Sequence, residues 1–122
     1  MQVNELSREE YERALAGVTP NPPIEQLGVW QDFEAGIPGR SLWGYVSLTD
    51  GDRTVAVAAF QQYETHGYRY LRGHHAPVWA EEPSEELESA ALGALADVVR
   101  ARDKGIVFVR HAVAHELPET RP

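Results

Sequence analysis

The dipeptide Asp50-Gly51 constrains the fold of this chain more than any other feature, because it separates two segments that both resemble β-strands. Glycine readily takes the positive φ that a tight hairpin turn requires. The preceding segment, Leu42 to Leu48, alternates in hydrophobicity, and the following segment, Thr54 to Tyr63, is rich in Val and Ala on both faces. The sequence therefore predicts a hairpin whose second strand is central and covered by helices.

Helix signals lie on both sides of this hairpin. The run Ser7-Arg8-Glu9-Glu10 has the pattern of a capping box and predicts a helix to about Ala16, after a short strand over Val3 to Leu6. A second helix is expected to begin at Asn21, with Pro22 at its first position. The spacing predicts one apolar face on this helix, made of Ile24, Leu27, Trp30 and Phe33.

The remaining elements complete a sheet. His66-Gly67 predicts a turn into a third antiparallel strand, Tyr68 to Arg72. The longest helix is expected to begin near Ser84 and to end at Gly105. It leads into the apolar strand Ile106 to Val109, which we expect to run parallel to a neighbour. The predicted fold class is mixed α+β (α/β), a single domain with a mostly antiparallel mixed sheet and helices packed on it.

Composition limits the possible function. A chain of 122 residues is typical of one domain, and its formal net charge of −8 disfavours non-specific nucleic-acid binding. Cysteine is absent, so disulfides and thiol chemistry are excluded. The N-terminal residues lack the pattern of a secretion signal and no segment is apolar enough to span a membrane, so we expect a cytoplasmic location.

The order of these elements resembles the first half of the Fem-type (FemABX) peptidoglycan aminoacyltransferases, which carry two halves with the fold of acyl-CoA acetyltransferases, called GNAT-like. The resemblance covers roughly residues 6–110 and rests on five segments: Pro23-Ile24-Glu25-Gln26 with Trp30, Asp50-Gly51, Tyr70-Leu71, Pro77-Val78 and Phe108-Val109-Arg110. It implies one GNAT-like half over residues 1–116, followed by a tail or linker over residues 117–122.

The resemblance also implies a function. Fem-type enzymes transfer an amino acid from aminoacyl-tRNA to the stem peptide of the peptidoglycan precursor, without a metal or organic cofactor. This half would help to hold the precursor, a UDP-linked or lipid-linked muropeptide, while the aminoacyl-tRNA would bind mainly through a second half that this chain lacks.

Two positions depart from the family pattern. Glu34 stands where the family often has a lysine that faces the phosphate of the precursor, and a carboxylate there would repel phosphate. The run Arg110-His111-Ala112-Val113 replaces Arg-x-Asp-Pro, so Ala112 stands in place of an aspartate. We therefore expect this chain alone to be inactive in transfer.

Four basic residues are candidates for binding substrate. Arg72 ends the third strand, and its guanidinium can hold a phosphate or carboxylate. The alternative is a surface arginine that interacts electrostatically with the acidic run of residues 81–88. His74 and His75 follow directly and can bind phosphate when protonated. Arg110 ends the last strand, where ligands often bind in mixed sheets, or else it forms an ion pair with a nearby acid.

Other patterns argue for packing or against particular chemistry. Trp30 and Trp79 are expected to anchor the core or a loop. His74 and His75 lack a third metal ligand at a suitable spacing, and His111 and His115 would align only on a helix, whereas a strand exit is expected there, so no metal site is predicted. An acetyl-CoA enzyme is a further possibility, but no Gly-x-Gly precedes a helix. The alternative function is a stand-alone, non-catalytic binding or dimerisation module, in which the exposed edge beside Ile106 to Val109 recruits a second copy.

Overall fold

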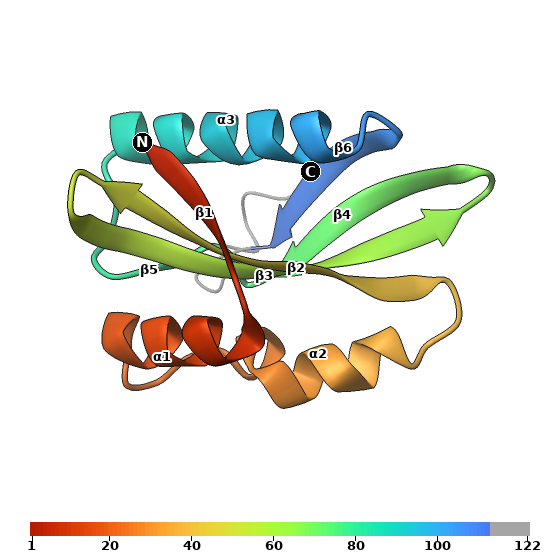
Figure 1. Ribbon diagram of the computed structural model, residues 1–122, viewed down its shortest axis with the longest axis horizontal. Helices are drawn as coiled ribbons and strands as arrows, with labels where there is room; N and C mark the ends of the chain where they lie inside the picture. The colour runs from red at the N-terminus through yellow and green to blue at the C-terminus, as the bar shows by residue number, and fades with distance from the viewer. Residues whose placement is uncertain (113–122) are drawn as a thin grey trace, which may run out of the picture.

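The computed structural model describes residues 1–112, so the expected tail over residues 117–122 lies outside the described part. Within that part, one mixed sheet is covered by helices on both faces (Figure 1). The elements follow in the order β1 (Gln2–Leu6), α1 (Arg8–Val18), the 3₁₀ turn η1 (Ile24–Gln26), α2 (Gly28–Ala35), β2 (Arg40–Asp50), β3 (Arg53–Thr65), β4 (Tyr68–His74), β5 (Val78–Trp79), α3 (Glu85–Arg102) and β6 (Ile106–Ala112).

The sheet has the strand order β1-β2-β3-β4-β6, and the short strand β5 pairs with β3 beside this path. Every pairing is antiparallel except that of β4 with β6, which is parallel. A parallel pair requires a long crossover, and α3 supplies it. Helix α3 lies on one face of the sheet, and α1 and α2 lie on the other (Figure 1). The predicted fold class and the parallel last strand are both confirmed.

Local sequence signals set several boundaries. Ser7 caps α1 through a complete capping box with Glu10, as predicted, and the helix runs two residues past Ala16, to Val18. Ser84 caps α3 by accepting a hydrogen bond from the backbone N–H of Leu87. The β2–β3 hairpin turns at Gly51, whose φ is +67°. Short-range turn and capping chemistry was therefore sufficient to place these elements.

The central strand β3 separates two apolar layers. Its residues Ala56, Ala58 and Phe60 pack toward α3, where Leu95 and Val99 are almost fully buried. Its alternate residues Val57 and Ala59 pack with Tyr11 and Leu15 of α1. Tyr45 and Val78 complete this second cluster. The prediction that this strand is central and buried on both faces is confirmed.

The second helix differs from its prediction. It begins at Gly28 rather than Asn21, because Leu27 has an extended backbone (φ −77°, ψ 150°) that separates it from the preceding 3₁₀ turn. The side chains of Ile24 and Phe33 are 56% and 61% exposed, although both were expected to be buried. The buried side chains of this segment are instead polar, namely Gln26, Gln31 and Glu34. In residues 1–112, no helix is long and apolar enough to cross a membrane.

Candidate functional site

The candidate site lies on β4, on the sheet face that also carries α1 and α2. These two helices pack chiefly against β2 and β3. Side chains alternate between the faces of a strand, so Tyr68, Tyr70, Arg72 and His74 share one face of β4. Tyr68 is 41% exposed and the other three are partly buried. The face of β4 thus offers three kinds of group, phenol, guanidinium and imidazole, at the side of the helices.

Aromatic rings form the floor of this surface. The rings of Tyr63 and Tyr70 stack with centroids 5.3 Å apart, as expected for residues directly opposite each other on β3 and β4. The guanidinium of Arg40 lies 4.7 Å from the centre of the Tyr63 ring, and that of Arg72 lies 6.0 Å from it. Cations over an aromatic face are attracted by its quadrupole, so Tyr63 helps to orient both arginines.

The guanidinium of Arg72 retains a hydrogen-bond donor that no described residue uses. Its Nε atom is buried and has no hydrogen-bond partner, and no ion pair joins Arg72 to any residue whose side chain the structure describes. In the acidic run, Glu81 pairs with Arg53 instead. The register also places Arg110 of β6 directly beside Arg72 of β4. Two of the predicted basic residues therefore occupy adjacent positions on neighbouring parallel strands.

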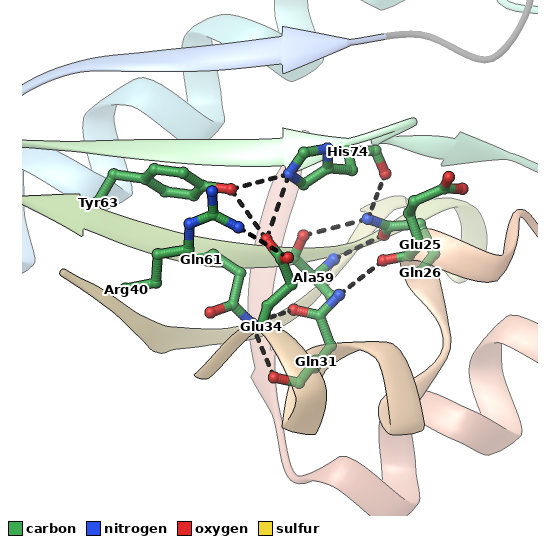
Figure 2. A network of polar contacts seen from close by, with 9 residues as sticks. All are labelled: Glu25, Gln26, Gln31, Glu34, Arg40, Ala59, Gln61, Tyr63 and His74. Atoms are coloured by element: carbon green, nitrogen blue, oxygen red, sulfur yellow. Dashed lines mark hydrogen bonds and ion pairs between the residues drawn. The ribbon is translucent and has the colours of Figure 1, made fainter. Parts of the chain in front are cut away.

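His74 belongs to a polar cluster that joins α2 to the sheet (Figure 2). Its Nε2 lies 3.0 Å from the hydroxyl of Tyr63 and 3.6 Å from Oε1 of Glu34. The Tyr63 hydroxyl donates to the same Glu34 oxygen at 2.9 Å, and Arg40 donates to the other carboxylate oxygen at 2.9 Å. One buried carboxylate thus receives both a neutral and a cationic donor.

This cluster changes the acidity of its members. Burial, assisted by the Glu34 carboxylate, raises the pKa of Tyr63 to about 12. Burial also lowers the pKa of His74, and the nearby charge of Arg72 lowers it further, although Glu34 opposes this effect. The site therefore holds a neutral phenol and a neutral imidazole at neutral pH, next to the cationic guanidinium of Arg72.

Glu34 has a different environment from the one expected. The sequence suggested a carboxylate that would face and repel phosphate, but the side chain of Glu34 is only 4% exposed and lies 2.9 Å from Nη1 of Arg40. Its charge is compensated inside the protein, because a buried carboxylate without a partner would be strongly unfavourable.

Gln26 closes a gap in the sheet next to this cluster. Strand β3 pairs with β5 at residues 56–57 and with β4 from Gln61 onward, so Ala59 lies between the two pairings. The side-chain amide of Gln26 accepts from the Ala59 N–H at 2.9 Å and donates to the carbonyls of Ala59, at 3.3 Å, and His74, at 2.7 Å. The side chain thus satisfies backbone groups that a neighbouring strand would otherwise bind.

Gln31 and Gln61 extend the same network toward α2. The Gln61 amide donates to Gln31, both to its side-chain oxygen and, at 3.3 Å, to its backbone carbonyl, and Gln31 donates to the carbonyl of Glu25 at 2.7 Å (Figure 2). Sequence reasoning did not identify Gln31 or Gln61 as part of a site. The available signal was the recurrence of polar residues at positions 26, 31 and 34, which marks one side of this segment.

His75 lies apart from its neighbour. Its backbone has φ +56°, a conformation that is uncommon for residues other than glycine, and the side chain lines a separate pocket together with Trp79. Trp79 also packs against the core beneath α3, in agreement with its expected packing role. Among the predicted residues, the structure brings Arg72, His74 and Arg110 to one end of β4 and β6, and it places His75 elsewhere.

Other expectations concern metal binding. No three His, Asp or Glu side chains within the described part of the chain are placed to hold a metal ion. His115, half of the predicted histidine pair, lies outside the described residues.

Comparisons with known proteins support the fold. No family model matches the chain, and no curated protein matches it. The crystal structure of FemX is similar to this chain, with a TM-score of 0.63 and 16% sequence identity over 83% of this chain and 25% of FemX. The chain therefore spans about a quarter of the length of FemX.

A ribosomal-protein-alanine N-acetyltransferase from Brucella melitensis biovar Abortus 2308 is also similar, with a TM-score of 0.56 and 12% identity. That match covers 97% of this chain and 82% of the acetyltransferase. At such low identity the likeness concerns the fold alone. The described chain accordingly has a mixed α+β, GNAT-like fold that resembles both FemX and an N-acetyltransferase.

Proposed function

We propose that this domain holds the peptidoglycan precursor, a UDP-linked or lipid-linked muropeptide, as one half of a Fem-type aminoacyltransferase. The observation that carries the proposal is the guanidinium of Arg72, whose buried Nε has no hydrogen-bond partner among the described residues. It lies 6.0 Å from the centre of the Tyr63 ring, and Arg72 is directly beside Arg110 in the sheet register. A guanidinium can hold a phosphate or carboxylate through two parallel hydrogen bonds.

The tyrosines favour the same class of ligand. A muropeptide linked to a nucleotide carries rings as well as phosphates, and stacked phenol rings such as Tyr63 and Tyr70 offer a flat apolar surface with polar edges. Compensation of Glu34 by Arg40 removes the repulsion that this carboxylate would otherwise exert on a phosphate. The basic end of β4 is thus chemically compatible with an anionic, ring-bearing ligand despite the net charge of −8.

In this proposal, the transfer step is the attack of an amine of the stem peptide on the ester of an aminoacyl-tRNA, and the amino acid moves to the amine as the tRNA hydroxyl leaves. The contribution of this domain is to position the amine-bearing partner. A second half, which would bind the tRNA, completes the site, so the domain alone binds precursor without transferring an amino acid.

The test is a calorimetric titration of the chain with UDP-linked muropeptide. Arg72→Ala should weaken binding by about tenfold or more, as expected for loss of a charge-assisted pair, and Arg72→Lys should recover only part of the affinity. Arg13→Ala, an exposed arginine on α1, is the matched control because it changes the net charge equally. Equal affinity of the Arg72→Ala variant and the wild-type chain would refute the role of this site.

A small acyl-CoA acetyltransferase is the competing catalytic assignment, since the chain covers 82% of the N-acetyltransferase that it resembles. The connection before α3 weighs against it, because it contains Glu81 and Glu82 and no Gly-x-Gly, and the first turn of α3 adds three more glutamates. Carboxylates would repel the pyrophosphate of the coenzyme. Saturable binding of acetyl-CoA, with turnover on a peptide amine, would favour this assignment over ours.

A stand-alone, non-catalytic dimerisation module is the other alternative. Strand β6 is the last strand in the sheet order and pairs with β4 along one side. Strand edges recruit other strands, so a second copy could pair there. A sedimentation measurement that gives twice 13.6 kDa at all concentrations, without precursor binding, would support this module.

A further inference from the structure

A cavity whose lining includes no member of the polar cluster lies beyond the end of β4. It has a volume of about 390 Å³ and lies between the α1–α2 connection, which supplies Asn21 and Pro23, and the connection from β4 to α3, which supplies His75. Because His74 faces Glu34 and His75 lines this cavity, consecutive residues serve two separate sites.

The walls of the cavity combine rings with apolar surface. Trp79 and His75 contribute aromatic rings, and Val78 and Pro77 contribute apolar area. The polar lining residues besides His75 are Thr19, Asn21, Glu81 and Glu82, and no lysine or arginine is among the lining residues. A cavity with carboxylates, aromatic rings and no cation selects for a positively charged ligand with an apolar portion.

The charges around the cavity strengthen this selection. Glu81 is already paired with Arg53, whereas Glu82 has no ion pair with any described residue. The start of α3, next to the cavity, would normally attract anions, but Ser84 caps the helix and three glutamates occupy its first turn. These carboxylates compensate the helix dipole, so an anionic ligand would meet repulsion at this end.

We propose that this cavity binds an alkylammonium group, with the ammonium beside Glu82 and Asn21 and the aliphatic stem against the walls formed by Trp79 and Val78. An ammonium pairs with a carboxylate through charge-assisted hydrogen bonds, and an indole face attracts a cation. This cavity uses residues that the precursor site on β4 does not use, so the amine site and the precursor site can be tested independently. The alkylammonium is either a free amine or the side chain of lysine in a peptide.

The experiment follows backbone amide shifts by NMR while two probes are added separately, n-butylammonium and Nα-acetyl-L-lysine amide. Both should shift the amides of His75 and Trp79. Saturation by n-butylammonium alone would identify a free amine as the ligand, and tighter binding of the lysine derivative would identify a peptide side chain. Nα-acetyl-norleucine amide, which has a similar stem without the charge, should bind at least tenfold more weakly.

Two variants complete the test. Glu82→Gln should weaken the binding of either amine by about tenfold, the loss expected for one charge-assisted pair. Glu86→Gln removes the same charge from the first turn of α3 without altering the cavity lining, so it should bind the amines as the wild-type chain does. Equal binding of the norleucine derivative, no saturable shift with either amine, or equal losses in Glu82→Gln and Glu86→Gln would each overturn the proposal.

Discussion

The hydroxyl of Tyr63 lies 2.9 Å from Oε1 of Glu34, and this hydrogen bond joins the central strand of the sheet to helix α2. The carboxylate is buried and the phenol remains neutral next to it, which gives the contact a direction: the hydroxyl donates and the carboxylate accepts. His74 lies at 3.0 Å from the same hydroxyl, so the state of this pair also affects the candidate site.

Stability at high pH should depend on Tyr63. Its pKa is raised to about 12 by burial and by Glu34, whereas an unfolded tyrosine ionises near 10. The unfolded chain therefore loses this proton first, and the free energy of unfolding should fall as pH rises from about 10 to about 12. Tyr63→Phe should flatten that decline when urea unfolding is measured across this range.

The pKa of Tyr11 is raised as well, so part of the decline should remain in the Tyr63→Phe variant. Tyr68→Phe serves as the control, because its ring is 41% exposed and lies outside the Glu34 cluster. A pH dependence in Tyr63→Phe that is identical to that of the wild-type chain would contradict the proposed neutral phenol.

The pKa of His74 should depend on the charge of Arg72. Burial and the Arg72 charge both lower it, so the unfolded chain takes up this proton first, and stability should be lost as pH falls below about 6.5. Arg72→Ala should raise the pKa of His74 in an NMR titration of the imidazole and reduce this loss. Arg53→Ala, which removes a distant cation, should leave the titration unchanged; an equal shift in both variants would count against a local effect.

Gln26 should matter for stability more than its polarity suggests. Gln26→Ala leaves backbone groups of Ala59 and His74 without partners, at a cost of about 3 kcal/mol in the free energy of unfolding. The amide of Ala59 should also exchange with solvent faster, which hydrogen-exchange NMR can measure. Gln2→Ala, at an exposed position of β1, should change neither quantity.

Substituting a polar residue of α2 should destabilise the protein more than substituting an apolar one, because the polar side of this helix is buried and the apolar side is exposed. Glu34→Ala removes the partner of Arg40 and Tyr63 and should cost about 3 kcal/mol. Val29→Ala, at a side chain that is 64% exposed, should change the free energy of unfolding by less than about 0.5 kcal/mol. Denaturant titrations of both variants check this, and a larger cost at Val29 would show that the apolar side is buried in solution.

Sequence patterns were sufficient where the cause of a structure is local. The turn at Gly51 and the cap at Ser7 depend on residues a few positions apart, and the parallel pairing of β6 follows from the length of α3. Arg72 and Arg110 could be identified as candidates because the sequence predicts strands that end at both, although β4 and β6 each run two residues further, to His74 and Ala112.

The polar face of α2 could not be predicted in this way. Rules of amphipathicity assume that apolar residues are buried, and Ile24 and Phe33 fit a helical spacing. The reason for burying Gln26 lies 33 residues away, where β3 lacks a neighbouring strand at Ala59 on the side where β4 and β5 pair. The sequence around Gln26 does not predict that gap, because the gap depends on where β4 and β5 pair with β3.

The amide of Gln26 has a mechanical consequence. It hydrogen-bonds both to Ala59 of β3 and to the carbonyl of His74 at the end of β4. The segment that contains Gln26 and the end of β4 are therefore held together before any ligand binds. Preorganisation of this kind reduces the entropy lost on binding. The distance between the basic surface of Arg72 and the cavity lined by His75 is therefore set by folding, and a molecule that engages both must match that span.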